Sequence, residues 1–236
     1  MKTKAILFDL DGTLLPLDQD AFVKAYVGGL VSATAKAGYP VPEMAQAIIQ
    51  GTEAMVQNRG EKTNEEVLLD TLVSAFGEGI RKDAYLFDAF HAGEFQKVRQ
   101  VCGFSPKAKE VIDLVKKRGF QAVLATNPLF PAKATHSRIR WAGLSPDDFS
   151  FVTTYENSRH SKPNLDYDRD ILSMLGLSAK ECVMVGNDVD EDMIAAELGM
   201  PVFLLTDCLL NRHSKDISAY PSGDFSALIT YLSSLS

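Results

Sequence analysis

The second half of this sequence alternates short apolar runs with longer amphipathic segments, and no other feature restricts its possible folds as strongly. Segments with apolar residues at helical spacing precede apolar runs that are short enough to be strands. These helix and strand pairs are residues 107–117 and 120–125, 131–141 and 149–153, 167–175 and 181–185, and 191–198 and 202–205. Because strands that alternate with helices form βαβ units, the sequence predicts an α/β fold with a doubly wound parallel sheet.

The first strand of this sheet is expected far from the others in sequence. Residues 4–8 form an apolar run that stops at acidic residues and a glycine, as a buried parallel strand would. The intervening residues 17–99 show helical periodicity and no convincing strand. The helical segments are 20–37, 42–58, 64–76 and 82–100. We therefore predict an α/β core domain from residues 1–15 and 101–236, and an inserted all-helical cap domain from residues 16–100.

Composition and charge restrict the function. An apolar fraction of 46% is ample for a packed core, and the formal net charge of −7 comes with basic residues scattered singly along the chain. This pattern offers no binding surface to nucleic acid or to a membrane, so we expect a small-molecule partner. No apolar stretch approaches membrane-spanning length, and the run behind Lys4 is broken by Asp9 too soon for a signal peptide. The sequence makes no prediction of oligomeric state.

The three cysteines, Cys102, Cys182 and Cys208, lie far apart and lack the spacing of a metal site. A reduced, cytoplasmic location is therefore the expectation that suits them best. Cys182 begins an apolar run and is expected in the core, with a catalytic thiol as the alternative.

Two carboxylates follow the first predicted strand. Asp9 and Asp11 lie two residues apart, so on an extended backbone their side chains point the same way. Carboxylates that close repel each other unless a cation lies between them, and Mg2+ prefers such oxygen ligands. The carboxyl ends of parallel strands are also where open α/β sheets bind ligands. The alternative is a strand that ends in an Asp-rich turn without chemistry.

Two further segments place polar side chains after an apolar run or before a helix. Thr126 and Asn127 follow the run 120–125 and could donate hydrogen bonds to phosphate oxygens, although both residue types are also common in turns. Lys162 lies in a polar loop that opens a helix, where it could hold a phosphoryl group as a fixed positive charge. Taken alone, Lys162 could equally be one of many solvated surface lysines.

The fourth polar segment is a dense acidic loop after the run 181–185. It contains Asn187, Asp188, Asp190, Glu191 and Asp192. Such a cluster costs electrostatic energy unless a cation compensates it. Capping of the following helix explains one or two of these residues, but not five.

In chain order, these four segments resemble the four motifs of the haloacid dehalogenase (HAD) superfamily of hydrolases. The matching residues are Asp9-Leu10-Asp11-Gly12-Thr13, Thr126-Asn127, Lys162-Pro163, and Gly186-Asn187-Asp188 with Asp192. The resemblance extends from Lys4 to about Leu205 and implies a HAD-like, Rossmannoid core, and the helical insertion resembles the C1 cap of that superfamily. Response-regulator receivers combine similar residues, but their acidic cluster precedes the Thr and the Lys, whereas here the second cluster comes last.

The resemblance implies a mechanism. Asp9 would attack phosphorus and form an aspartyl phosphate, and Asp11 would act first as general acid and then as general base. Thr126, Asn127 and Lys162 would bind the phosphate group. The implied cofactor is Mg2+.

The resemblance also implies where the magnesium would bind. Its ligands would be the Asp9 carboxylate, the Asp11 main-chain carbonyl and the Asp188 carboxylate, while Asp192 would support the site by orienting Lys162 or a water on the metal.

The fourth motif departs from the family pattern. The family usually has Gly-Asp at this point, whereas this chain has Gly186-Asn187-Asp188. We assign the metal to Asp188, because its spacing to Asp192 and to the following alanines matches the usual pattern. The alternative is that Asn187 stands in the metal position.

The expected function is therefore that of a magnesium-dependent phosphatase acting on a small phosphorylated metabolite. A 2-haloacid dehalogenase would use the same nucleophile, but that branch typically lacks the second carboxylate, so Asp11 favours phosphate. A phosphosugar mutase would need the same Asp pair and a C1 cap, and a non-catalytic binding module is a further alternative. The sequence does not identify the substrate, and Arg59, Lys62 and Lys82 in the cap are expected to be solvated surface residues.

Overall fold

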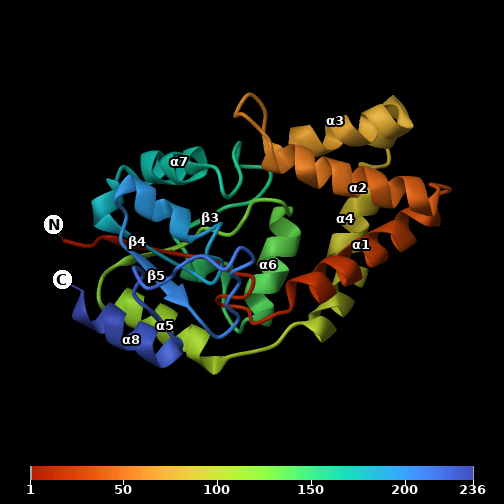
Figure 1. Cartoon of the computed structure of the whole chain (residues 1–236). Coiled ribbons are helices and arrows are strands. Elements are labelled where there is room, and N and C mark those ends of the chain that lie inside the picture. The colour runs from red at the N-terminus through yellow and green to blue at the C-terminus, as the bar shows by residue number, and fades with distance from the viewer. Residues whose placement is uncertain (1, 236) are drawn as a thin grey trace.

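The computed structural model describes residues 2–235, and its centre is a sheet of six parallel strands (Figure 1). The strand order is β3-β2-β1-β4-β5-β6, so β1 lies inside the sheet although it comes first in the chain. The predicted doubly wound α/β fold is confirmed. The strands are β1 (Ala5–Phe8), β2 (Gln121–Leu124), β3 (Phe151–Val152), β4 (Cys182–Gly186), β5 (Val202–Leu205) and β6 (Ser222–Gly223).

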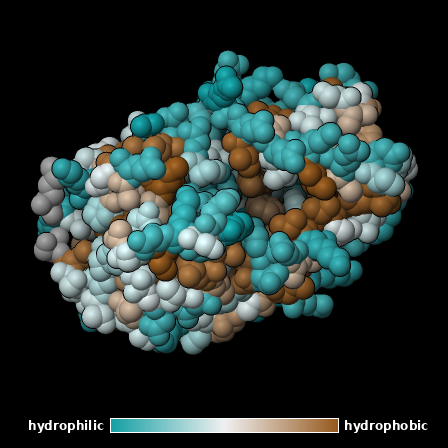
Figure 2. All heavy atoms as spheres, viewed as in Figure 1, coloured by the Kyte–Doolittle hydropathy of each residue, from teal (hydrophilic) through white to brown (hydrophobic). Residues whose placement is uncertain are grey.

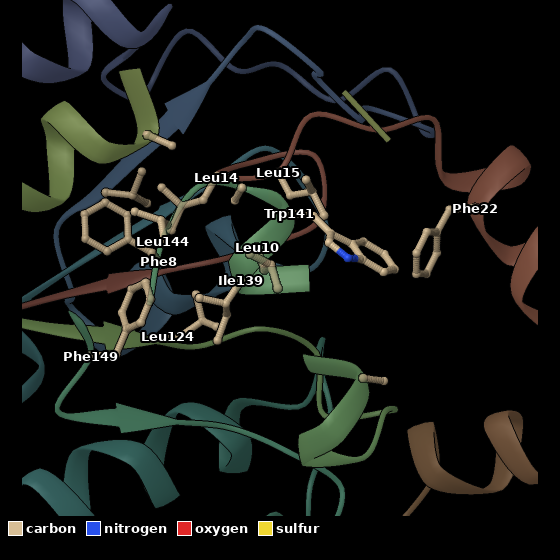
Figure 3. Packing of buried hydrophobic residues seen from close by; sticks show 14 of the residues in the cluster. Phe8, Leu10, Leu14, Leu15, Phe22, Leu124, Ile139, Trp141, Leu144 and Phe149 are labelled. Atoms are coloured by element: carbon tan, nitrogen blue, oxygen red, sulfur yellow. The ribbon is translucent and has the colours of Figure 1, made fainter. Parts of the chain in front are cut away.

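Alternate residues of each strand face opposite sides of the sheet, as strand geometry requires. Phe8 and Leu124 belong to one hydrophobic cluster, and the preceding residues Leu7 and Val123 belong to a second. Figure 3 shows the first cluster, in which Phe8 and Leu124 lie close to Phe149. Because both faces of the sheet are buried, the central strands β1, β4 and β5 are continuous apolar runs without polar alternation.

Helices cover both faces of the sheet (Figure 1). The cluster shown in Figure 3 receives side chains from α5 (Pro106–Lys117), α6 (Ala132–Trp141) and α8 (Phe225–Ser234). The second cluster receives them from α7 (Leu165–Leu175) and the 3-10 helix η5 (Met193–Leu198). Two shorter 3-10 helices, η3 (Pro146–Asp148) and η4 (Ala179–Glu181), lead into β3 and β4.

The regular elements between β1 and β2 are all helices, and we call residues 19–101, which precede α5, the helical insertion. It consists of α1 (Gln19–Ala35), α2 (Val41–Val56), α3 (Asn64–Phe76), η1 (Glu78–Arg81), α4 (Ala84–Ala92) and η2 (Glu94–Val101). Figure 1 shows α1 to α4 packed together to one side of the sheet. The two connecting segments meet at its base, where Leu17 and Cys102 form an antiparallel bridge. The division into separate core and cap domains stays a prediction.

Some elements differ from those that the sequence predicts. The segment 82–100 is divided at Gly93 into α4 and a 3-10 helix. The helix expected from residue 191 begins only at Met193, because the side chain of Asp188 accepts hydrogen bonds from the main-chain N–H groups of Asp190 and Glu191 and holds them in a turn. Within residues 2–235, no helix is both long enough and apolar enough to cross a lipid bilayer.

Candidate active site

The central strands β1 and β4 bring the first and fourth acidic segments together. Asp9 follows β1 and Asp188 lies two residues after β4, and β1 pairs with β4 in parallel. This is the point where the strand order reverses, and such points leave a crevice at the carboxyl end of the sheet. A single cavity there is lined by Asp9, Asp11, Thr126, Asn127, Asn187, Asp188, Glu191, Asp192 and Arg212, together with Gln19 and apolar side chains.

Lys162 contacts both the first and the fourth acidic segments. Its side chain is 2% exposed, and its Nζ atom donates to Oδ1 of Asp192 at 2.6 Å and to Oδ1 of Asp9 at 3.1 Å. Burial alone would lower the pKa of Lys162, but the two carboxylates raise it well above its ordinary value. Lys162 is therefore a buried cation at the predicted nucleophile, not a solvated surface residue.

Asp192 turns back toward its own loop. Its second oxygen accepts a hydrogen bond from the main-chain N–H of Asp188 at 3.0 Å. A Cβ atom at Gly186 would lie 2.0 Å from Oδ2 of Asp192, so only glycine lets the carboxylate approach this closely. Burial raises the pKa of Asp192, while the nearby Lys162 ammonium opposes that shift.

Asn187 and Asp188 have different surroundings. Both polar groups of the buried Asn187 side chain are used internally, because Oδ1 accepts from the Thr13 hydroxyl at 2.8 Å and Nδ2 donates to the Cys208 carbonyl at 2.7 Å. A Cβ atom at Gly12, where φ is +83°, would lie 2.4 Å from Asn187 Nδ2. Asn187 thus fastens the first loop to the fourth, while Asp188 carries a carboxylate at the cavity. The metal-ligand roles themselves stay predictions.

Thr126 and Asn127 lie at the end of β2. The main-chain carbonyl of Thr126 accepts hydrogen bonds from the hydroxyls of Thr153 and Tyr167, and the buried Thr126 is among the residues that line the cavity. Asn127 Nδ2 donates to Glu191 Oε2 at 3.0 Å, and Asn127 Oδ1 is buried without a partner among the described residues. Burial raises the pKa of Glu191 to about 7. The sequence placed Glu191 in the acidic loop but did not single it out as a site residue.

Arg138 of α6 is a site residue that the sequence did not reveal. Its side chain is 0% exposed, its Nη1 pairs with Oδ2 of Asp11, and its guanidinium lies 4.2 Å from the ring centre of Phe130. Burial raises the pKa of Asp11 to about 6, although Arg138 opposes the shift. The helical spacing of α6 could have revealed this burial. Arg138 lies four residues after Ala134 and three before Trp141, so it shares a helix face with these two buried residues.

Arg212 is the second cation that sequence reasoning missed. It lies in the loop after β5, and its Nη1 contacts Oδ2 of Asp188 at 2.5 Å while 48% of the side chain stays exposed. The loop has no periodic pattern, and nothing in the sequence connects it with the acidic segment 24 residues before it. Arg212 therefore acts as a counter-ion to Asp188 that solvent can still reach.

The residues fit a magnesium ion that also takes oxygen atoms from a phosphate. Within residues 2–235, no group of three or more His, Cys, Asp or Glu side chains could hold a metal by itself. Mg2+ usually binds through one or two carboxylates, with waters and substrate phosphate completing its shell. Asp9 and Asp188 supply two carboxylates to one cavity, and the charge on Asp188 already attracts a cation, Arg212.

Comparison with known proteins places the chain in a family. The sequence matches the family model of haloacid dehalogenase-like hydrolases over residues 3–199. A search of curated proteins finds no match.

Solved structures with the same fold include enzymes of two kinds. A 2-haloacid dehalogenase from Pseudomonas syringae pv. Tomato DC3000 is 20% identical over 98% of each chain, with a TM-score of 0.67. A predicted phosphoglycolate phosphatase from Haemophilus somnus 129PT is 19% identical over 98% of each chain, with a TM-score of 0.59. A putative HAD hydrolase from Bacillus subtilis, whose structure is bound to magnesium, is 18% identical over 98% of this chain and 99% of that chain, with a TM-score of 0.56.

At these identities the solved structures show a shared fold, and they do not separate phosphatase from dehalogenase. The family match is stronger evidence, because it spans the segments from Asp9 to Asp192 that line the cavity, together with Lys162, which contacts Asp9. The resemblance inferred from the sequence is confirmed, and the chain belongs to the haloacid dehalogenase-like hydrolases.

Proposed function

We propose that this protein is a magnesium-dependent phosphatase that hydrolyses a small phosphomonoester. The observation that carries the proposal is the carboxyl group of Asp11, which lines the same cavity as Asp9. Its Oδ1 atom is buried and has no partner among the described residues, and burial raises its pKa to about 6. A carboxyl group whose pKa is raised toward neutral can take up a proton and pass it on at that pH, as the protonation of a leaving alcohol requires.

Asp9 is the proposed nucleophile. Its carboxylate oxygen forms a bond to phosphorus as the bond from phosphorus to the leaving oxygen breaks, and the product is an aspartyl phosphate. Asp11 gives its proton to the leaving oxygen, so an alcohol departs. Water then attacks phosphorus and gives a proton to Asp11, which restores Asp9 and releases inorganic phosphate.

The remaining residues position the phosphoryl group. The ammonium of Lys162, which lies 3.1 Å from Asp9, would attract the transferring oxygens, and the side chains of Thr126 and Asn127 would donate hydrogen bonds to them. Asp192 holds Lys162 in place through its 2.6 Å contact. A magnesium ion held by Asp9, Asp188 and the Asp11 carbonyl would neutralise charge on the nucleophile and the phosphate.

Dehalogenation of a 2-halo acid is the main alternative. A departing halide needs no proton, so this reaction gives Asp11 no chemical role, whereas phosphomonoester hydrolysis gives it one. A phosphosugar mutase would also use the Asp pair, but it would return an isomerised sugar phosphate without net release of phosphate. A non-catalytic binding module would need none of these protonation states.

Product analysis separates these functions. The purified protein is incubated with 4-nitrophenyl phosphate, with a panel of phosphorylated metabolites and with 2-chloropropionate, each in the presence of magnesium or of a chelator. We expect magnesium-dependent release of phosphate and no release of chloride. Release of chloride without release of phosphate would establish the dehalogenase instead, and an isomerised sugar phosphate without free phosphate would establish the mutase.

A further inference from the structure

A second cavity lies inside the helical insertion, beside the proposed active site. Its volume is about 140 Å³, and most of its wall is apolar. α2, α3, η1 and α4 contribute Ile48, Leu68, Leu72, Ile80 and Phe87, and the core contributes Leu129. Figure 2 shows the face on which the core and the insertion meet, where hydrophobic residues gather around a hollow.

One wall separates this cavity from the proposed phosphate site. Leu129 lines both cavities, and the next residue, Phe130, lines the phosphate site and packs against Tyr26 of α1, with ring centres 4.9 Å apart. A hydrogen bond also connects the helical insertion with the core at this wall. Asn64, at the start of α3, is fully buried and donates to the Pro128 carbonyl at 3.1 Å.

The same asparagine donates to the hydroxyl of Ser161 at 3.0 Å, and that hydroxyl donates to the Met55 carbonyl of α2 at 3.1 Å. Ser161 directly precedes Lys162, so the start of α3 is held against the loop that carries the active-site cation. The group attached to a phosphate at Asp9 would therefore lie next to α3 and the cavity that α3 lines.

The charged side chains that line this cavity are acidic, while the cations Lys133 and Arg138 lie outside the lining and help burial to lower the pKa of His91. Among the described residues that line it, none is lysine or arginine, and the acidic ones are Glu65 and Asp88. Asp88 is already paired with Lys133 at 2.8 Å, whereas no ion pair of Glu65 is found within residues 2–235. Burial is the main cause that raises the pKa of Glu65, and the nearby carboxylates of Glu156 and Asp88 add to the shift.

Two other polar residues of the lining, Tyr26 and His91, are uncharged at neutral pH. Tyr26 and His91 are joined by a hydrogen bond of 3.1 Å between the hydroxyl and Nε2. Burial lowers the pKa of His91 to about 4, so the imidazole is neutral near pH 7. The cavity thus offers an apolar wall, a neutral hydrogen-bonding pair and acidic residues, and its described lining contains no cation that would pair with an anion.

We propose that this cavity binds the leaving group of the substrate, that this leaving group has an apolar body without negative charge, and that Glu65 rejects anionic ones. The inference rests on the proposed phosphatase function and narrows its substrate class to monophosphates of neutral or cationic alcohols. An anionic leaving group would face Glu65 without a cation to pair with, and like charges brought together at a binding site are strongly disfavoured.

Three aryl phosphates test the inference. They are 4-methylphenyl, 4-(aminomethyl)phenyl and 4-(carboxymethyl)phenyl phosphate. The first is neutral at the para position, the second carries a cation there and the third an anion. In the two charged compounds a methylene group separates the charge from the aromatic ring and so from the reacting oxygen. Phosphate release gives kcat/KM for each compound with the wild-type protein, Glu65→Gln, Glu65→Lys and Glu53→Lys. Glu53 is exposed on α2 and does not line the cavity, so Glu53→Lys makes the same charge change at a control position.

For the wild-type protein we expect the carboxymethyl compound to be the poorest substrate, by about tenfold relative to the methyl compound. Glu65→Gln should reduce this difference several-fold, Glu65→Lys should remove or reverse it, and Glu53→Lys should leave it unchanged. The compounds also differ in the intrinsic reactivity of their leaving groups. This difference cancels, because the quantity compared between variants is the ratio of kcat/KM for the carboxymethyl compound to kcat/KM for the methyl compound.

Two results would overturn the inference in distinguishable ways. If phosphate is released from all three compounds and Glu65→Lys has the wild-type ratio, the phosphatase stands and the assignment of Glu65 and its cavity is wrong. If the wild-type protein releases phosphate from none of them, nor from 4-nitrophenyl phosphate, the proposed function fails and the inference fails with it. Thermal melting of each variant verifies that it is folded.

Discussion

Arg138 and Asp11 form an ion pair inside the protein, between the helix that follows β2 and the loop that follows β1. The arginine side chain is 0% exposed and that of Asp11 is 13% exposed. The guanidinium also lies over Phe130 of the core and, at 5.8 Å, over Phe22 of α1. The pair therefore connects the proposed general acid with the first helix of the insertion.

Breaking this pair from one side should destabilise the fold. Arg138→Met leaves a mostly buried carboxylate without its cation, and we expect a loss of about 3–5 kcal/mol in the free energy of unfolding. Asp11→Asn should also destabilise, because it leaves Arg138 unpaired. The double variant should lose clearly less than the sum of the single losses. Urea unfolding of the four proteins measures this, and additive losses would show that the two side chains do not interact.

Asp9→Asn should abolish turnover and preserve the fold. An amide is a poor nucleophile of nearly the same volume, and Lys162 keeps its 2.6 Å contact with Asp192. We expect kcat for 4-nitrophenyl phosphate to fall by at least about 10³-fold. Asp190→Asn is the matched control, because Asp190 lies in the fourth loop but pairs outside the cavity with His213 and Lys215. Near wild-type hydrolysis by Asp9→Asn would rule out the aspartyl-phosphate mechanism.

Asp11→Asn should slow the enzyme most on esters with poor leaving groups. An alkyl leaving group needs a proton from Asp11, whereas 4-nitrophenolate can leave without one, so we expect a loss of about 10²–10⁴-fold for alkyl esters and a much smaller loss for the nitrophenyl ester. The measurement is kcat for both kinds of ester in the wild type and the variant. Equal losses on both would count against the acid and base role.

Magnesium should stabilise the folded protein through Asp188. A ligand that binds only the folded state adds about 1.4 kcal/mol for each tenfold increase in concentration above its dissociation constant. Asp188→Ala should lose most of the magnesium-induced rise in Tm. Asn187→Ala should keep it but start from a lower Tm, because Asn187 links Thr13 to Cys208.

Arg212→Ala provides a further comparison in the same thermal melts. Its guanidinium, 2.5 Å from Asp188, competes with any other cation for that carboxylate, so its removal should let magnesium act at lower concentrations. Loss of the shift in Asn187→Ala with retention in Asp188→Ala would reverse the assignment of the fourth loop. A wild-type protein without any shift would contradict magnesium binding.

His91 should make stability depend on pH. Its pKa is about 4 in the folded protein, against an ordinary value of 6.5, because burial disfavours the imidazolium. Between these values the unfolded chain binds more protons, so the free energy of unfolding rises with pH, and about 3 kcal/mol is lost as the pH falls from 6.5 toward 4.

The test compares urea unfolding across this pH range. The free energy of unfolding of His91→Asn is subtracted from that of the wild type at each pH. The difference should rise with pH, since the contributions of the other titrating groups cancel. His213→Asn is the control, because its ring is 71% exposed. Parallel profiles for wild type and His91→Asn would contradict the neutral, buried imidazole.

The sequence by itself determined the α/β fold and the place where its site would form. Apolar runs that alternate with amphipathic segments have few solutions other than a parallel sheet covered by helices. Because parallel strands end on the same edge, residues such as Asp9 and Asp188 could be expected together although they lie far apart in the sequence. The burial of Lys162 could not be read from its loop, but the order of the motifs predicted that it would lie near Asp9.

The tertiary structure alone decided which side chains surround those carboxylates. Arg138 and Arg212 look like ordinary basic residues of a helix and a loop, and only the packing of distant segments places them at Asp11 and Asp188. The negative lining of the cavity near Glu65 has the same origin, because it depends on how α3 and α4 are turned toward the core. Local periodicity determines which elements form, whereas contacts between elements far apart in the chain set the charge and burial of each site residue.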